Sequence, residues 1–110
     1  METYTLMSIF AHPIVVIPAR LSASRLPNKP LANIHGEPMI VHVWKRAVEA
    51  DIGPVIVACG EQEIADAVDA AGGISVLTTS DLPSGSDRVY EAVVRFDPDS
   101  RYDTVVNVQG

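Results

Sequence analysis

Three cations within residues 15–31 have the types and spacing best suited to chemistry. Arg20, Arg25 and Lys29 lie in the stretch VVIPARLSASRLPNKPL, which contains no acidic residue. Its three prolines exclude a long helix, so the cations belong to a stiffened loop. Arg offers planar bidentate donors to phosphate and Lys a point charge, which suits a polyanion such as a triphosphate. An ordinary surface loop with scattered cations is the alternative, and the loop alone does not decide between them.

The overall charge makes this cluster unusual. The chain has 110 residues, with 8 Lys and Arg against 14 Asp and Glu, and a formal net charge of -6. Residues 1–46 carry five of the cations and two of the acids, so positive charge is concentrated near the loop. An acidic chain is a poor general binder of nucleic acid or membrane surfaces, and we expect neither as a partner. A small anion at the loop fits this distribution.

The loop is positioned by the strand before it. Residues 14–17 are a continuous β-branched run, typical of a strand buried in a parallel sheet. We expect further strands at 54–58, 74–77 and 104–108, a short extended piece at 31–34, and helices at about 38–50, 61–71 and from the turn at 84–87 to residue 96. This alternation predicts an α/β fold with a mostly parallel sheet and helices on both faces.

Ligands of such sheets bind at the carboxyl ends of the strands, and the cationic loop follows one of those ends. Gly60, the turn at 84–87 and Gln109 follow other strands, so we expect them at the same edge. Ser84 and Asp87 have the spacing of a helix-capping pair. The acidic residues of 61–69 are expected on a solvated helix face.

Other site types are disfavoured. The sequence has no GxxxxGK[ST] motif and no GxGxxG after the first strand, which argues against P-loop and dinucleotide-binding proteins. The single cysteine, Cys59, excludes an intrachain disulfide, and we expect it to be a packed residue and not a reactive thiol. The three histidines lack ligand spacing. No secretory signal is visible, and a cytoplasmic location is expected.

Four motifs resemble those of the 3-deoxy-manno-octulosonate cytidylyltransferases, also called CMP-Kdo synthetases. They are PAR-x4-RLPxKPL at 18–31, GEPMIVHV at 36–43, SGSDR at 84–88 and VNVQG at 106–110. The resemblance implies a Rossmann-like nucleotide-diphospho-sugar transferase fold, of which this chain is the N-terminal part. Residues 1–13 would form an extension, and residues 14–110 the CTP-binding portion of a domain that continues beyond the chain.

The resemblance also implies a Mg²⁺-dependent enzyme that joins CTP to the sugar acid Kdo, releases pyrophosphate and supplies CMP-Kdo for lipopolysaccharide biosynthesis. Arg20 and Lys29 would be catalytic. The CTP-binding set carried over from the family is Ala19, Arg20, Arg25, Lys29, Ser84, Gly85, Arg88 and Gln109. The intact protein would be a homodimer. The family's Mg²⁺-binding aspartate would lie just beyond Gly110, with no metal ligand in this chain, so we expect these residues alone to be inactive.

One departure from the family pattern bears on the site. The family often has Thr-Asp where this chain has Cys59-Gly60, which puts a nucleotide contact at position 60 in doubt. Two alternatives to the Kdo enzyme stay open. One is another sugar nucleotidylyltransferase, such as a sialic-acid cytidylyltransferase, and the other is a non-catalytic nucleotide-binding module.

Overall fold

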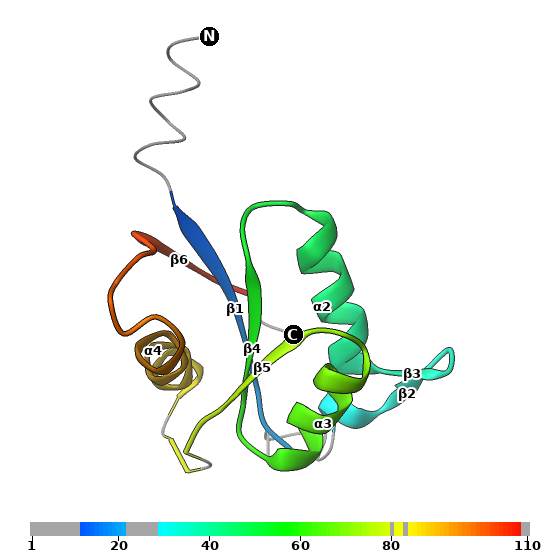
Figure 1. The fold of residues 1–110 in the computed structure, drawn as a ribbon. Coiled ribbons are helices and arrows are strands. Elements are labelled where there is room, and N and C mark those ends of the chain that lie inside the picture. The colour runs from blue at the N-terminus through cyan, green and yellow to red at the C-terminus, as the bar shows by residue number, and fades with distance from the viewer. Residues whose placement is uncertain (1–11, 22–28, 80, 83, 109–110) are drawn as a thin grey trace, which may run out of the picture.

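A four-stranded parallel sheet forms the centre of the computed structural model, which describes residues 12–21, 29–79, 81–82 and 84–108. The strand order is β5-β4-β1-β6 (Figure 1). The strands are β1 (Pro13–Ala19), β4 (Val55–Cys59), β5 (Ile74–Leu77) and β6 (Thr104–Asn107). All three pairings between neighbouring strands are parallel, which confirms the predicted α/β sheet.

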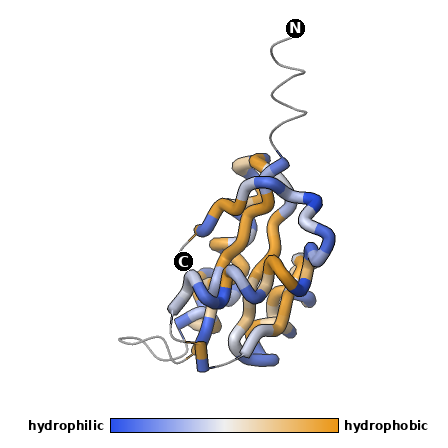
Figure 2. Tube along the Cα trace, turned by 90° about the vertical axis from the view of Figure 1, so that its left-hand side faces the viewer, coloured by the Kyte–Doolittle hydropathy of each residue, from blue (hydrophilic) through white to orange (hydrophobic). Residues whose placement is uncertain are grey.

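Helices cover both faces of this sheet, as the alternation predicted. The helices α2 (Met39–Glu49) and α3 (Gln62–Ala70) lie on one face, and α4 (Gly85–Phe96) lies on the other (Figure 1). Alternate residues of β1 and β4 enter two separate apolar clusters, one under each helical layer. Figure 2 shows the strands as hydrophobic along most of their length. This double burial explains why β1 reads as a continuous β-branched run.

The strand β1 continues through Pro18 to Ala19, two residues past the predicted run. The N–H of Val15 bonds the carbonyl of Pro54, just before β4, so the nitrogens of Val16 and Pro18 face β6 by alternation. The register with β6 ends at Val16 opposite Asn107. The missing N–H of Pro18 therefore costs no ladder hydrogen bond in β6, and the strand can extend to the edge where the cations begin.

A small hairpin lies before α2 and includes part of the extended piece predicted at 31–34. The 3-10 turn η1 (Lys29–Leu31) is followed by β2 (Asn33–Ile34) and β3 (Glu37–Pro38), which pair antiparallel. His35 and Gly36 join the two strands, and both have positive φ as a tight hairpin turn requires. Pro38 has a ψ of 145°, so α2 begins one residue later than expected, at Met39.

The predicted cap of the third helix is confirmed. Ser84 Oγ accepts the N–H of Asp87 at 3.2 Å and donates to Asp87 Oδ2 at 2.7 Å. This satisfies one of the N–H groups that a helix start leaves unpaired. Glu91 and Arg95, four residues apart on this helix, also form an ion pair at 3.1 Å.

The segment between α4 and β6 is organised by one buried carboxylate. Asp97 accepts the N–H groups of Arg101 and Tyr102, each at 2.9 Å. Burial alone would raise the pKa of Asp97, but these donors outweigh it and lower the pKa. The carboxylate therefore stays charged and holds the turn that leads into β6.

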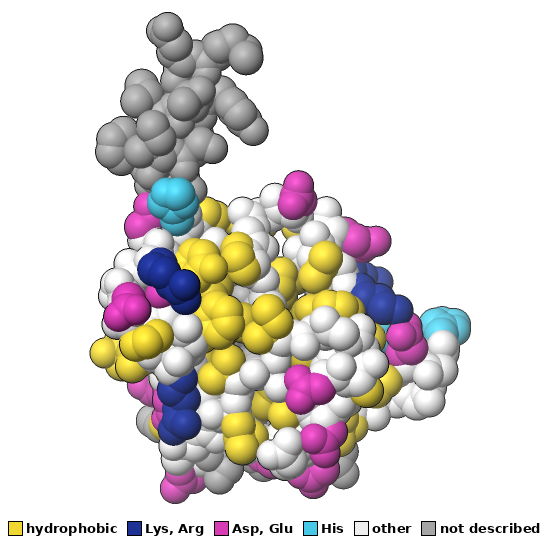
Figure 3. All heavy atoms as spheres, in the orientation of Figure 1, with side chains coloured by type: hydrophobic (Ala, Val, Ile, Leu, Met, Phe, Trp, Pro, Cys, Tyr) yellow, Lys and Arg dark blue, Asp and Glu magenta, His cyan; other side chains and the backbone are white. Residues whose placement is uncertain are grey.

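The surface of the molecule mixes apolar and charged side chains. Figure 3 shows apolar side chains across the middle of one face, in the region where β5 runs in Figure 1. Ile74 and Leu77 of β5 are each 45% exposed. Within the described residues, no helix is long and apolar enough to cross a membrane.

Replacing Gly53 with alanine is expected to lower the free energy of unfolding by about 2 kcal/mol, because overpacked sites cost this much. An added Cβ would overlap the backbone oxygen of Pro13, which a side-chain rotation cannot relieve. Gly72→Ala is the control, since its φ of 94° strains an alanine but its surroundings are open, and we expect about 1 kcal/mol there. Urea unfolding measures the free energy of unfolding of both variants. Equal losses in Gly53→Ala and Gly72→Ala would contradict a steric overlap at position 53.

Candidate functional site

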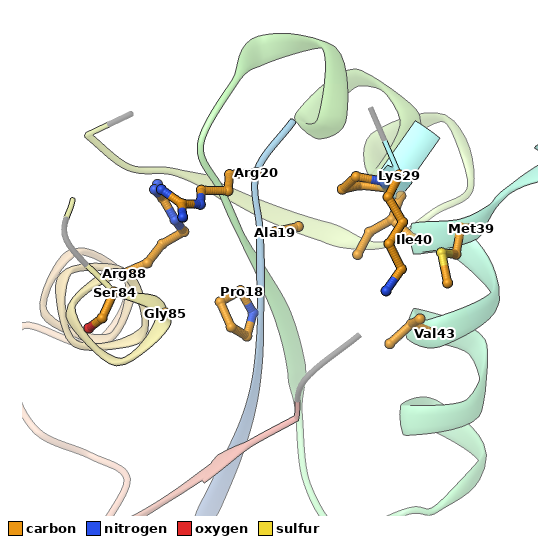
Figure 4. Close-up of a pocket in the computed structure, with 11 residues that line it drawn as sticks. Pro18, Ala19, Arg20, Lys29, Met39, Ile40, Val43, Ser84, Gly85 and Arg88 are labelled. Carbon is orange, nitrogen blue, oxygen red and sulfur yellow. The ribbon is translucent and has the colours of Figure 1, made fainter. Parts of the chain in front are cut away.

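A pocket opens at the carboxyl edge of the sheet, where the sequence placed the ligand. It lies between the end of β1, η1, the start of α2 and the start of α4 (Figure 4). The lining residues are Pro18, Ala19, Arg20, Lys29, Pro30, Met39, Ile40, Val43, Ser84, Gly85 and Arg88. Its volume of about 250 Å³ is slightly below the usual lower limit of about 300 Å³ for small-molecule sites. These residues therefore form enough wall for part of a nucleotide.

Cations stand on two sides of this pocket. Figure 4 shows Lys29 on one side of Ala19, and Arg20 on the other side with its guanidinium close to that of Arg88. Neither the side chain of Arg20 nor that of Lys29 forms a hydrogen bond or ion pair with another residue in the described part of the chain. None of the described lining residues is acidic. Positive groups held together with no acidic side chain among the described lining residues make this a site for an anion.

Arg88 is the most deeply buried of these cations. Its side chain comes from α4, its exposed fraction is 1%, and its Nη1 donates to Thr78 Oγ1 at 2.6 Å and to the Thr79 carbonyl at 2.8 Å. Thr78 Oγ1 in turn donates to the Cys59 carbonyl at 3.0 Å. Burial lowers the pKa of Arg88, and the charge of Arg20 adds to this effect. Arg88 thus joins α4 to the ends of two strands while presenting its charge beside Arg20.

The start of α4 forms the wall around Arg88. Ser84 and Gly85 line the pocket, but the Ser84 hydroxyl is engaged with Asp87 in the helix cap. Capping and ligand contact are compatible here, because the backbone N–H groups of a helix start favour anions. The sequence reasoning allowed for both roles, and the geometry shows the cap.

Gly60 and Glu61 form a turn that packs against Arg20 from the β4 side. A Cβ on Gly60 would lie 3.0 Å from the Cβ of Arg20 and 3.1 Å from Nη1 of Arg88. Position 60 therefore has little space for a side chain in this conformation. Glu61 Oε1 accepts the N–H of Leu21 at 2.8 Å. The expectation that the acids of 61–69 share a solvated face is wrong for Glu61, because its carboxylate reaches back to β1.

The structure brings most of the predicted site residues together. Ala19, Arg20, Lys29, Ser84, Gly85 and Arg88 all line the pocket. Arg25 and Gln109 lie outside the described residues. The sequence reasoning missed the apolar wall from α2, which consists of Met39, Ile40 and Val43. It also missed Glu61, although an acid directly after a strand end at the predicted ligand edge was a usable signal.

A cluster of metal-ligating side chains is not found in the described part of the chain. No group of three His, Cys, Asp or Glu side chains within residues 12–21, 29–79, 81–82 and 84–108 could hold a metal ion.

Cys59 is the last residue of β4 and lies next to the site, but we expect its thiol to be unreactive in the folded protein. It is fully buried, as predicted, and burial raises its pKa to about 12. The thiolate is the reactive form, so the folded protein should resist iodoacetamide at pH 8 at this residue. Mass mapping of the peptide should show labelling only after unfolding in urea. Labelling of the folded protein at the unfolded rate would contradict this view.

Comparisons with known proteins identify the family to which this chain is similar. The family model for cytidylyltransferases matches residues 14–110. The 3-deoxy-manno-octulosonate cytidylyltransferase of Rhodospirillum centenum is 71% identical over 99 residues, covering 90% of this chain and 38% of the relative. The enzyme of that name from Paramagnetospirillum magneticum is 65% identical over 98 residues, covering 89% of this chain and 40% of the relative.

A solved structure of CMP:2-keto-3-deoxy-manno-octonic acid synthetase complexed with CTP superposes with a TM-score of 0.77 and 40% identity. The match covers 90% of this chain and 40% of that chain. The present chain thus spans about 40% of the length of these relatives. The resemblance seen in the motifs and the predicted fold class are both confirmed, and the chain belongs to the cytidylyltransferase family.

Proposed function

We propose that the intact protein containing this chain transfers CMP from CTP to Kdo, forming CMP-Kdo and pyrophosphate. The observation that carries the proposal is the pair of cations, Arg20 and Lys29, whose side chains share one pocket at the carboxyl edge of the sheet. Membership of the cytidylyltransferase family supports the reaction type. The relatives named for 3-deoxy-manno-octulosonate support the choice of sugar.

In this reaction a hydroxyl oxygen of Kdo forms a bond to the α-phosphorus of CTP. The bond between that phosphorus and the bridging oxygen of the β-phosphate breaks, pyrophosphate leaves with the electron pair, and the proton of the Kdo hydroxyl is released. Arg20 and Lys29 would hold the triphosphate and offset the charge that grows on the leaving group. The nucleophile belongs to the substrate, so the chain needs no nucleophilic side chain of its own.

The remaining parts of the proposal concern the intact protein. Mg²⁺ would supply further charge at the triphosphate, with ligands from outside the described residues. The protein would act in the cytoplasm, as a homodimer, and supply lipopolysaccharide biosynthesis. The volume of the pocket supports binding of part of CTP by this chain.

Pyrophosphate release by the intact protein, with Mg²⁺ and CTP, tests the proposal. Kdo, sialic acid and no sugar are compared in parallel, and we expect release only with Kdo. Release with sialic acid instead would reassign the sugar within the same reaction class. Saturable CTP binding without release from any sugar would favour a non-catalytic nucleotide-binding module.

A further inference from the structure

Glu61 directs its carboxylate away from its own helix. It is the N-cap residue of α3, with φ -137° and ψ 154°, yet its side chain makes no capping hydrogen bond. Instead, Oε1 accepts the N–H of Leu21 at 2.8 Å, across 40 residues of sequence. The side chain of an N-cap residue ordinarily accepts a hydrogen bond from a backbone N–H of the first helical turn. The Glu61 side chain accepts the N–H of Leu21 instead.

The residue before Glu61 makes a second contact with the same segment. The N–H of Gly60 donates to the Ala19 carbonyl at 2.8 Å. Gly60 and Glu61 therefore hold the residues on either side of Arg20, one through a carbonyl and the other through an N–H. The backbone at Arg20 is fixed from both directions by a single turn.

The same turn also sets the space and charge around the Arg20 side chain. Because Gly60 has no side chain, the Cβ of Arg20 and the guanidinium of Arg88 can both lie next to it. The charge of Arg20 lowers the pKa of Arg88, and the Glu61 carboxylate acts on that pKa in the opposite direction. Removing Glu61 would therefore change both the backbone that carries Arg20 and the local field.

We infer that Glu61 is a positioning residue that orients Arg20 for the triphosphate by fixing the Leu21 N–H. This inference rests on the proposed function, because it concerns the same site. Glu61 would touch neither CTP nor Kdo, and its influence on turnover would pass through Arg20.

Two variants of the intact protein separate position from charge. Glu61→Gln keeps the length and one acceptor oxygen but removes the charge. Glu61→Asp keeps the charge but is one methylene shorter, so its carboxylate no longer accepts the N–H of Leu21. Asp is also a favoured N-cap residue, so Glu61→Asp should fold with an undiminished Tm. Glu63→Gln is the matched control, because Glu63 is an exposed acid in the first turn of the same helix.

We expect Glu61→Asp to lower kcat/KM for CTP by about tenfold, the order of one hydrogen bond to a charged group. The KM for Kdo should stay unchanged, since Arg20 faces the triphosphate. Glu61→Gln should remain within about threefold of the parent protein, because a neutral acceptor keeps most of the contact. Hydrogen exchange of the Leu21 amide should accelerate in Glu61→Asp and stay protected in Glu61→Gln.

Several results would overturn the inference. Parent-like kcat/KM in Glu61→Asp would remove the positioning role, and a lowered Tm with parent-like kinetics would leave Glu61 purely structural. Equal losses of kcat/KM for CTP in Glu61→Asp and Glu61→Gln would show that the role does not depend on the length of the side chain. If the parent protein itself released no pyrophosphate, the proposed function would fail, while the exchange of Leu21 would still report on the anchor.

Discussion

Arg20→Ala in the intact protein is expected to lower kcat/KM for CTP by about a hundredfold, the usual loss when one charge-stabilising donor is removed. Arg20 lies at the end of β1 in the pocket and has no hydrogen-bond or ion-pair partner in the described part of the chain. Its loss should therefore leave the free energy of unfolding nearly unchanged. Lys29→Ala, on the opposite wall, should act in the same direction.

The matched control for Arg20→Ala is Arg95→Ala. Arg95 is an exposed arginine on α4 whose pair with Glu91 lies outside the pocket, and such surface pairs contribute little. The kcat/KM of Arg20→Lys for CTP should lie between those of the parent protein and Arg20→Ala, because lysine keeps the charge but loses the bidentate geometry. Steady-state kinetics with CTP varied at saturating Kdo measures all of these variants. Unchanged kinetics in Arg20→Ala would remove the triphosphate role.

The layout of the fold was predictable because its signals are local. The apolar run of β1 and the stripes of the helices are read from neighbouring residues, and a parallel sheet then fixes which loops meet at one edge. These signals place Arg20, Lys29 and Ser84 at the same edge of the sheet. The hairpin of β2 and β3 was only partly predictable, because strands of two residues are too short to show alternation.

Contacts across long sequence separations were not predictable in the same way. An apolar stripe predicts that a helix face is covered, but not that Met39 and Val43 line a pocket. Glu61 reads as one acid among several on an amphipathic helix. Its contact with Leu21 depends on the parallel register of β1 and β4, which pairs Ala19 with Cys59 and so brings the two strand ends together.

Arg88→Met is expected to lower the free energy of unfolding by about 2 kcal/mol, since it removes charged donors from buried acceptors. Methionine preserves much of the apolar stem, so the loss reports mainly on the bonds to Thr78 and the Thr79 carbonyl. Those bonds hold the end of β5 against α4, beside the pocket wall. We therefore expect kcat/KM for CTP to fall as well.

A double-mutant cycle with Thr78→Val tests whether Arg88 acts through this network. Valine is similar in size but removes the oxygen that accepts from Arg88 and donates to Cys59. In the Thr78→Val background, Arg88→Met should lower the free energy of unfolding by about 1 kcal/mol less than it does in the parent protein. A coupling of this size is typical of residues in one network. Urea unfolding of the four proteins measures it. Additive losses would mean that Thr78 contributes nothing to the placement of Arg88, and the guanidinium would then be held beside Arg20 by its other contacts.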